Sequence, residues 1–393
     1  MRTAQITHIA RRSTVWVMSA MWLAAMALHA GRASTNTVQP AAAVTNDSAA
    51  AAPAFMLDED TMRSIVTITG SRGAGTGFIA SHNGKIYLFS NVHVLMGNAN
   101  MRFLNNRGEA FYPVAMEAAS DRDVVRLTLR TPPRHSLKID TPGAVNVPVA
   151  VCGNAEGEDV MRSVGGTIVG VGPIKIETDA QFVRGHSGSP ILTSDGRVLG
   201  IATYVKRGNP DWVSTNTPFS VTRRFGYRLD NIKSWIKVDP AWFKSEAEFL
   251  RQREEKLYQL TALLDIWAED PYWQQLPEDY TSVLHRGMMD WVRAHNERIA
   301  SNQRRLLSAR ASHSKAAELS REFHEQLRQD AEVLKREMHV MWQGPRPRWH
   351  LAFFKDYAAD LDAWHSTLLK AVDHLVLLHA SYNPVVVKQR TQP

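Results

Sequence analysis

Residues 178–190, TDAQFVRGHSGSP, decide the fold of this chain. Within them, GHSGSP at 185–190 sets a serine between two glycines and ends on a proline. Glycines let the backbone take conformations that other residues avoid, and they remove bulk around the hydroxyl of Ser187. Backbone N–H groups that converge beside such a hydroxyl can hold an oxyanion. The composition predicts a turn that presents Ser187 as a nucleophile, although a surface turn has the same composition.

Two upstream segments carry the partners that a serine nucleophile needs, namely a base and a third group that holds the base's tautomer. The first segment has GTGF at 75–78 and SNVHV at 90–94, which puts His93 at the end of a strand predicted over 86–89. The second is DRDVVRL at 121–127, where two aspartates precede an apolar strand pattern. The three segments together point to nucleophilic catalysis.

In the order His, Asp, Ser, these segments resemble the signatures of the trypsin-like (chymotrypsin-fold) serine proteases. GHSGSP is similar to the family's nucleophile turn, SNVHV to its histidine segment, and DVVRL to the strand that follows its aspartate. VCGN at 151–154 and VGGTIV at 164–169 resemble a hairpin of the bacterial Deg/HtrA-type proteases. The motifs span about residues 62–236, and the resemblance implies an all-β double-barrel protease domain.

The resemblance implies a role for each matching residue. Ser187 is the nucleophile, His93 is the general base, and the amides of Gly185 and Ser187 form the oxyanion hole. An aspartate orients His93, and Asp123 is assigned this role because the apolar strand follows it directly. Asp121, two positions earlier, is expected to face solvent or to cap the turn.

Substrate-binding residues follow from the same resemblance. Ala202, Thr203 and Tyr204 are expected to form an edge that pairs with an extended substrate backbone. Gln181 is expected at the floor of the pocket that receives the side chain before the cleaved bond, and no preference for lysine or arginine follows from it. His186 stands where the family usually has Asp or Asn, and this departure could perturb the loop without entering the chemistry.

Composition sets the broad class of the protein. A chain of 393 residues with 44% hydrophobic content has room for two domains and a leader. The net charge of +7 is spread along the chain without a block of like charges, so nucleic-acid binding is not predicted. With Cys152 as the single cysteine, no internal disulfide can form, and its place beside an apolar strand predicts a buried thiol.

The N-terminus has the pattern of a secretory signal. Residues 1–33 combine early arginines, an apolar run over 14–30 and small residues near 33, which predicts a signal peptide. The apolar run reaches the short limit for a membrane span, so an uncleaved anchor is the alternative and the one route to a membrane. Residues 34–54 predict a disordered linker. We therefore expect a periplasmic or secreted protein.

After the protease domain, predicted over 55–238, residues 239–393 change character. Apolar residues recur at steps of three and four, which predicts a helical domain. Helices are expected from residue 240 to the prolines at 271 and 277, and over the ranges 280–310, 314–342 and 349–381. No PDZ signature follows the protease segment, so we infer no PDZ-gated activation. We expect the helices to recruit substrate or to form a homo-oligomer.

No metal site or cofactor is predicted. HEQLR at 324–328 begins like the zinc motif H-E-x-x-H, but Arg328 stands where the second histidine must be. His365, His374 and His379 share one predicted helix, yet no carboxylate or cysteine set accompanies them.

The predicted function is a serine endopeptidase that hydrolyses protein or peptide substrates through an acyl-enzyme. Its triad consists of His93, Asp123 and Ser187. The alternative is a protease-like binding scaffold in which the helical domain is the interaction module. A third reading, ester hydrolysis on the same triad, stays open.

Overall fold

The computed structural model describes residues 56–207, 222–278, 284–309 and 313–391. The predicted signal peptide, 1–33, and the predicted linker, 34–54, lie outside the described residues. Residue contacts divide the chain into two compact units. Unit 1 comprises residues 1–247 and 349–354, and unit 2 comprises residues 248–348 and 355–393. The division after 247 lies beyond the predicted domain boundary at 238, and unit 1 takes in a second stretch from much later in the chain.

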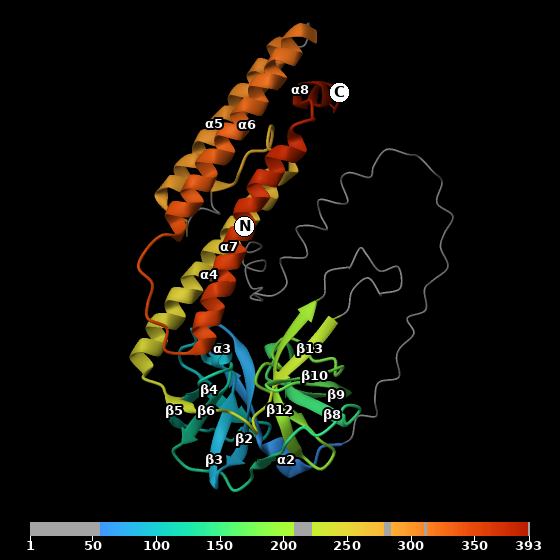
Figure 1. Ribbon diagram of the computed structural model, residues 1–393, viewed down its shortest axis with the longest axis vertical. Helices are drawn as coiled ribbons and strands as arrows, with labels where there is room; N and C mark the ends of the chain where they lie inside the picture. The colour runs from blue at the N-terminus through green and yellow to red at the C-terminus, as the bar shows by residue number, and fades with distance from the viewer. Residues whose placement is uncertain (1–55, 208–221, 279–283, 310–312, 392–393) are drawn as a thin grey trace, which may run out of the picture. The chain divides into compact units, whose positions relative to one another are not determined.

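The described part of unit 1 is a β-domain, shown in Figure 1. Its fourteen described strands are all joined in one sheet. The strands are β1 (Ile65–Thr69), β2 (Ala74–His82), β3 (Lys85–Ser90), β4 (Arg102–Asn105), β5 (Pro113–Ala119), β6 (Val125–Leu129), β7 (Leu137–Ile139), β8 (Pro148–Asn154), β9 (Met161–Val171), β10 (Lys175–Thr178), β11 (Pro190–Leu192), β12 (Arg197–Arg207), β13 (Thr222–Tyr227) and β14 (Trp235–Lys237).

The strands fall into an earlier and a later group that meet at β7. Strands β1 to β6, with β14, pair antiparallel with one another, and so do β8 to β13. Short β7 pairs in parallel with β2 on one side and with β12 on the other. The predicted β-domain followed by a helical region is confirmed at this level.

Two hydrophobic cores hold the sheet together. One centres on Phe78 and Phe89, which are opposite each other on β2 and β3 with ring centroids 5.7 Å apart. The other gathers residues of the later strands, Ile168 and Ile191 among them. Burial of such side chains is the main stabilising term of the domain. Cys152 is fully buried in the first core, and burial raises the pKa of its thiol to about 12, so it is an inert apolar residue.

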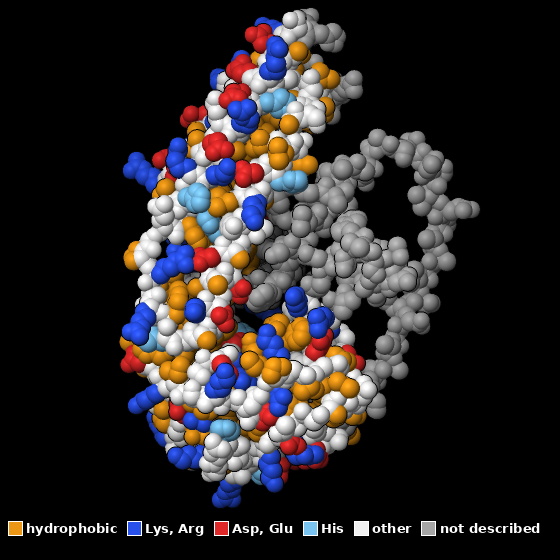
Figure 2. Space-filling view, viewed as in Figure 1, with side chains coloured by type: hydrophobic (Ala, Val, Ile, Leu, Met, Phe, Trp, Pro, Cys, Tyr) orange, Lys and Arg blue, Asp and Glu red, His pale blue; other side chains and the backbone are white. Residues whose placement is uncertain are grey.

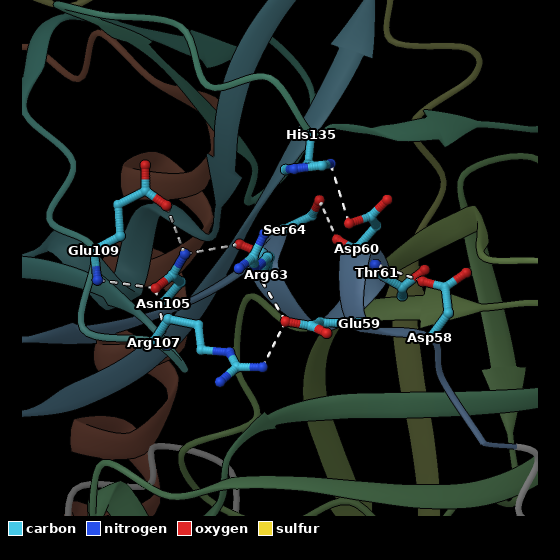
Figure 3. A network of polar contacts seen from close by, with 10 residues as sticks. All are labelled: Asp58, Glu59, Asp60, Thr61, Arg63, Ser64, Asn105, Arg107, Glu109 and His135. Atoms are coloured by element: carbon cyan, nitrogen blue, oxygen red, sulfur yellow. Dashed lines mark hydrogen bonds and ion pairs between the residues drawn. The ribbon is translucent and has the colours of Figure 1, made fainter.

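A one-turn helix, α2 (Glu59–Arg63), precedes β1. The Asp58 carboxylate caps it by accepting the N–H of Thr61 at 2.7 Å, which satisfies a backbone donor that a helix start leaves open. Figure 3 shows how further polar contacts join α2 to other segments. Asp60 pairs with His135 at 3.3 Å, and the amide of Asn105 donates to the carbonyl of Arg63 at 3.3 Å.

The helical region has long helices, as its periodicity predicted (Figure 1). They are α4 (Pro240–Glu269), α5 (Arg286–Ala309), α6 (His313–Trp342), α7 (Ala352–His379) and the short α8 (Pro384–Thr391). Apolar residues of unit 2 turn inward: Trp267 is fully buried and meets Trp291 edge to face at 5.6 Å. Figure 2 shows basic and acidic side chains interspersed over the described helices.

Two histidines of unit 2, His295 and His365, are packed structural groups. His295 is fully buried and donates through Nε2 to the Gln274 carbonyl at 3.1 Å, and burial lowers its pKa to about 4. His365 stacks on Trp342 at 4.6 Å, and burial likewise lowers its pKa to about 4.

Within the described ranges, no cluster of three or more His, Cys, Asp or Glu could hold a metal ion. Nor does any described helix have the length and apolarity to cross a membrane.

Candidate active site

The serine loop, residues 184–189, has its shape because glycine stands at two positions. Gly185 and Gly188 both have left-handed backbone conformations, with φ of 91° and 86°. A Cβ atom at Gly185 would stand 1.9 Å from the carbonyl oxygen of Asn154, and one at Gly188 would stand 1.9 Å from that of Thr76. Both neighbours are backbone and cannot move aside. The glycines are therefore required by close approach as well as by conformation.

A Gly188→Ala variant tests this requirement. We expect it to lose about 3 kcal/mol or more of unfolding free energy, from left-handed strain together with the clash against Thr76. Gly143→Ala is the matched control, since a Cβ there meets nothing within 4 Å, and its effect should stay within about 0.5 kcal/mol. Denaturant unfolding of the two variants measures the difference. Equal stabilities would contradict the steric account.

The loop leaves two N–H groups open beside the serine. Within the described parts of the chain, the amides of Gly185 and Ser187 have no hydrogen-bond acceptor. The carbonyl of Arg184 accepts from Glu156 N at 2.8 Å. In a trans peptide the N–H points opposite to the carbonyl, so the N–H of Gly185 points away from Glu156. The carbonyl of Ser187 accepts from Thr76 N at 2.9 Å. Two such amides can stabilise an oxyanion.

The strand predicted over 86–89 is present as β3, but His93 does not end it: His93 lies just after it in a single helical turn, α3 (Val92–Leu95). Strand β3 ends at Ser90, and Asn91 begins the turn. The Asp123 carboxylate holds this turn at two points. It accepts from His93 Nδ1 at 2.5 Å through one oxygen and from the backbone N–H of His93 at 3.1 Å through the other.

The carboxylate of Asp123 is therefore fully engaged with one residue. Its side chain is 4% exposed, whereas the side chain of His93 is 32% exposed. An acceptor at Nδ1 puts the proton of a neutral imidazole on that nitrogen and leaves Nε2 free to accept one. This is the arrangement that a general base requires.

Asp121, the competing aspartate, has a different partner. Its two carboxylate oxygens accept from Nε and Nη2 of Arg122, each at 2.9 Å. The guanidinium also donates to the carbonyl of Arg228 and to the side chain of Asn231, both at 2.8 Å. Hydrogen bonding to Arg122 lowers the pKa of Asp121 below its ordinary value. Asp121 thus belongs to a structural ion pair at the turn.

Asn91 is a site residue that the sequence reasoning missed. It is fully buried, and its amide donates to the carbonyl of Asp123 at 2.6 Å and to the hydroxyl of Thr203 at 3.2 Å. One side chain thus joins the turn of His93, the aspartate segment and β12. Its place two residues before the histidine in SNVHV was the available signal.

Ser187 lies in the serine loop, and its hydroxyl donates to the carbonyl of Thr203 at 3.3 Å. His186, beside it, is 1% exposed, and its Nδ1 lies 3.3 Å from the carbonyl of Val183. Burial lowers the pKa of His186, which favours the neutral ring at ordinary pH. His186 therefore packs under the loop as a neutral side chain.

The predicted substrate edge has mixed roles. The N–H of Ala202 donates to the Ser189 carbonyl at 2.8 Å, and the carbonyl of Ala202 accepts from Gly188 N at 2.9 Å, so its backbone holds the serine loop. The pairing of β12 with β13 is irregular at Thr203, between Ala202 and Tyr204. The Tyr204 hydroxyl accepts from the Lys175 amine at 2.9 Å.

Gln181, predicted at the pocket floor, is exposed. Its side-chain amide donates to the carbonyl of Asp179 at 3.0 Å. Its neighbours Ala180 and Phe182 are buried in the core of the later strands. The substrate-binding roles of Gln181 and of the edge at 202–204 remain predictions.

A family model for the trypsin-like peptidase domain matches residues 75–201. This range includes His93, Asp123 and Ser187. The chain therefore contains a trypsin-like peptidase domain over residues 75–201. The resemblance that the sequence motifs suggested is thereby confirmed, and the family match covers the part of unit 1 that carries the serine loop.

Several known proteins are similar to part of this chain. Protease Do-like 1 of the Arabidopsis thaliana chloroplast is 28% identical over 167 residues, which are 38% of this chain and 37% of that protein. The chain therefore spans well under half the length of this curated relative. Among solved structures, an inactive form of Rv3671c of M. tuberculosis is 20% identical to this chain, with a TM-score of 0.35. The match covers 46% of this chain and 89% of the Rv3671c chain. A serine endoprotease of Yersinia pestis is 22% identical with a TM-score of 0.34, and covers 42% of this chain and 59% of its own.

Proposed function

We propose that the protein is a serine endopeptidase whose triad is His93, Asp123 and Ser187. The observation that carries the proposal is the pair of hydrogen bonds from His93 to Asp123, with Nδ1 at 2.5 Å and the backbone N–H at 3.1 Å. This pairing fixes the ring and its tautomer. The serine loop supplies the nucleophile, Ser187, and the amide N–H groups of Gly185 and Ser187 that would hold the oxyanion.

The reaction follows from these groups. His93 Nε2 takes the proton of the Ser187 hydroxyl as Oγ attacks the peptide carbonyl, and the amides of Gly185 and Ser187 hold the oxyanion. The imidazolium then gives that proton to the leaving amine, and the carbonyl carbon stays bonded to Oγ as an acyl-enzyme. Water, deprotonated by His93, then attacks the ester carbon; the bond from that carbon to Oγ breaks, the acid is released, and the imidazolium returns its proton to Oγ of Ser187. Asp123 accepts from Nδ1 of His93 throughout and stabilises the imidazolium without taking its proton.

The surrounding architecture completes the proposal. We assign the two strand groups that meet at β7 to the two barrels of the protease domain, followed by a separate helical domain. The substrates are proteins or peptides. The predicted leader would take the protein to the periplasm or outside the cell, and the helical domain would recruit substrate or mediate self-association.

A fluorophosphonate probe tests the chemistry directly. The probe phosphonylates a serine only where a base activates it, so we expect one labelled residue, Ser187, identified by mass spectrometry of the digested protein. Peptide turnover should fall in proportion to labelling. A folded protein that is neither labelled nor able to cleave would favour the scaffold reading. Labelling with ester turnover but no peptide turnover would favour the ester hydrolase.

A further inference from the structure

Residues 349–354, WHLAFF, belong to unit 1 although they follow three long helices in the sequence. They meet the first turns of α4, which also belong to unit 1. His350 stacks on Trp242 with ring centroids 4.6 Å apart. The nearly buried carboxylate of Glu246 accepts from the backbone N–H of His350 at 3.2 Å and also pairs with its Nδ1.

Apolar contacts fix the same segment. Phe354 is fully buried and lies 5.3 Å from the ring of Phe243, and Leu351 is 1% exposed. The residue that follows β14 connects the start of α4 to the sheet, because Val238 N donates to the Met116 carbonyl at 2.9 Å. Asp239 then caps α4 by accepting from Ala241 N at 2.8 Å. Residues 349–354 therefore have a defined position within unit 1.

This position brings an aromatic side chain to the candidate base. The ring centroid of Phe353 is 6.5 Å from that of His93, with the ring planes tilted by 37°. Asp123 occupies the Nδ1 edge of the imidazole. The ring of Phe353 is only half-buried, so part of it stays accessible next to His93, whose own side chain is 32% exposed.

We propose that Phe353 is a specificity-determining residue, forming an apolar wall of the subsite beside His93. The proposal rests on the proposed peptidase function. During cleavage the ring of His93 must reach both the Ser187 hydroxyl and the leaving amine, so the substrate side chains beside the primary residue pass near that ring. The exposed part of the phenyl ring there offers apolar surface, and a bulky apolar side chain gains by covering it. The substrate class is therefore a peptide with such a residue next to the primary one.

The test compares selectivity between matched peptides. Let P1 be the residue whose carbonyl is attacked, P2 the residue before it, and P1′ the residue after it. Internally quenched peptides carry either Leu or Ala at P2 or at P1′, and the ratio of kcat/KM for Leu over Ala is measured at each position. We expect the full-length protein to favour Leu at one of them. Phe353→Ala should lower that ratio roughly 10-fold, the scale of a few methylene contacts in an apolar pocket.

Two further variants keep the test decisive. Lys355→Ala changes an exposed residue two positions along the same helix and should match the unaltered protein. Phe353→Leu keeps apolar bulk and should lower the ratio by about 3-fold, so it carries the test if the alanine variant does not fold. Labelling of Ser187 by a small fluorophosphonate, which does not reach the subsite, should proceed at the same rate in all variants.

Each outcome has one meaning. An unchanged Leu/Ala ratio in a folded, labelled Phe353→Ala protein overturns the inference and leaves the proposed peptidase intact. If Phe353→Ala lowered kcat/KM equally for the Leu and Ala peptides and also slowed labelling, Phe353 would only support the position of His93. If it raised all three equally, residues 349–354 would obstruct the site. Either result overturns the inference. An unaltered protein that is neither labelled nor cleaves peptides overturns the proposed function, and this inference with it.

Discussion

Ser187→Ala is expected to lower kcat/KM on a cleavable peptide by roughly 10⁴- to 10⁶-fold, the loss seen when a serine triad loses its nucleophile. No acyl-enzyme can form without the hydroxyl, and the residual rate comes from the oxyanion hole and from binding. The fold should persist, since the hydroxyl makes one hydrogen bond, to the carbonyl of Thr203 at 3.3 Å. Peptide kinetics and thermal unfolding on one preparation measure both.

Ser194→Ala is the matched control. Ser194 is an exposed serine seven positions further along, in the turn between β11 and β12. Its removal should leave both turnover and stability unchanged. Peptide cleavage that survives in Ser187→Ala would remove this residue from the chemistry, and cleavage lost in the control as well would point to a folding defect.

The serine loop could be predicted from the sequence because its constraints are local. The left-handed backbone and the lack of room for a Cβ atom require glycine at positions 185 and 188. Both glycines fall within six consecutive residues, 185–190, so the pattern can be recognised from the sequence. The choice of Asp123 over Asp121 also depended on local information, since the apolar strand begins just after it. The long helices followed from the spacing of apolar residues over several turns, which is the most reliable signal a sequence carries.

What could not be predicted depends on contacts between distant segments. The 6.5 Å approach of Phe353 to His93 joins residues 260 positions apart, and no periodicity or motif encodes it. The buried link from Asn91 to Asp123 and Thr203 is of the same kind. The end of β3 at Ser90, before the helical turn of His93, depends on the carboxylate of Asp123, which holds that turn by its backbone N–H as well as its ring.

Substitutions at the two aspartates are expected to have separate effects, on catalysis at Asp123 and on stability at Asp121. Asp123→Asn should lower kcat by about 10⁴-fold near neutral pH, because the new amide donates to Nδ1 of His93. The imidazole proton then moves to Nε2, the nitrogen that must accept from Ser187. The substitution preserves shape, so the folded structure should remain. Kinetics at several pH values, with circular dichroism on the same samples, measure the effect.

Asp121→Asn is the matched control, two residues away with the same chemical change. It weakens the pairing of Asp121 with Arg122, whose side chain is 1% exposed. Losing a charged partner of a buried guanidinium should lower the unfolding free energy by about 1–3 kcal/mol, while kcat stays within about 2-fold of the unaltered protein, because Asp121 bonds to Arg122 and not to His93. If Asp121→Asn abolished turnover and Asp123→Asn spared it, the 2.5 Å contact between Asp123 and His93 would not be the catalytic one, and the proposed triad would be wrong.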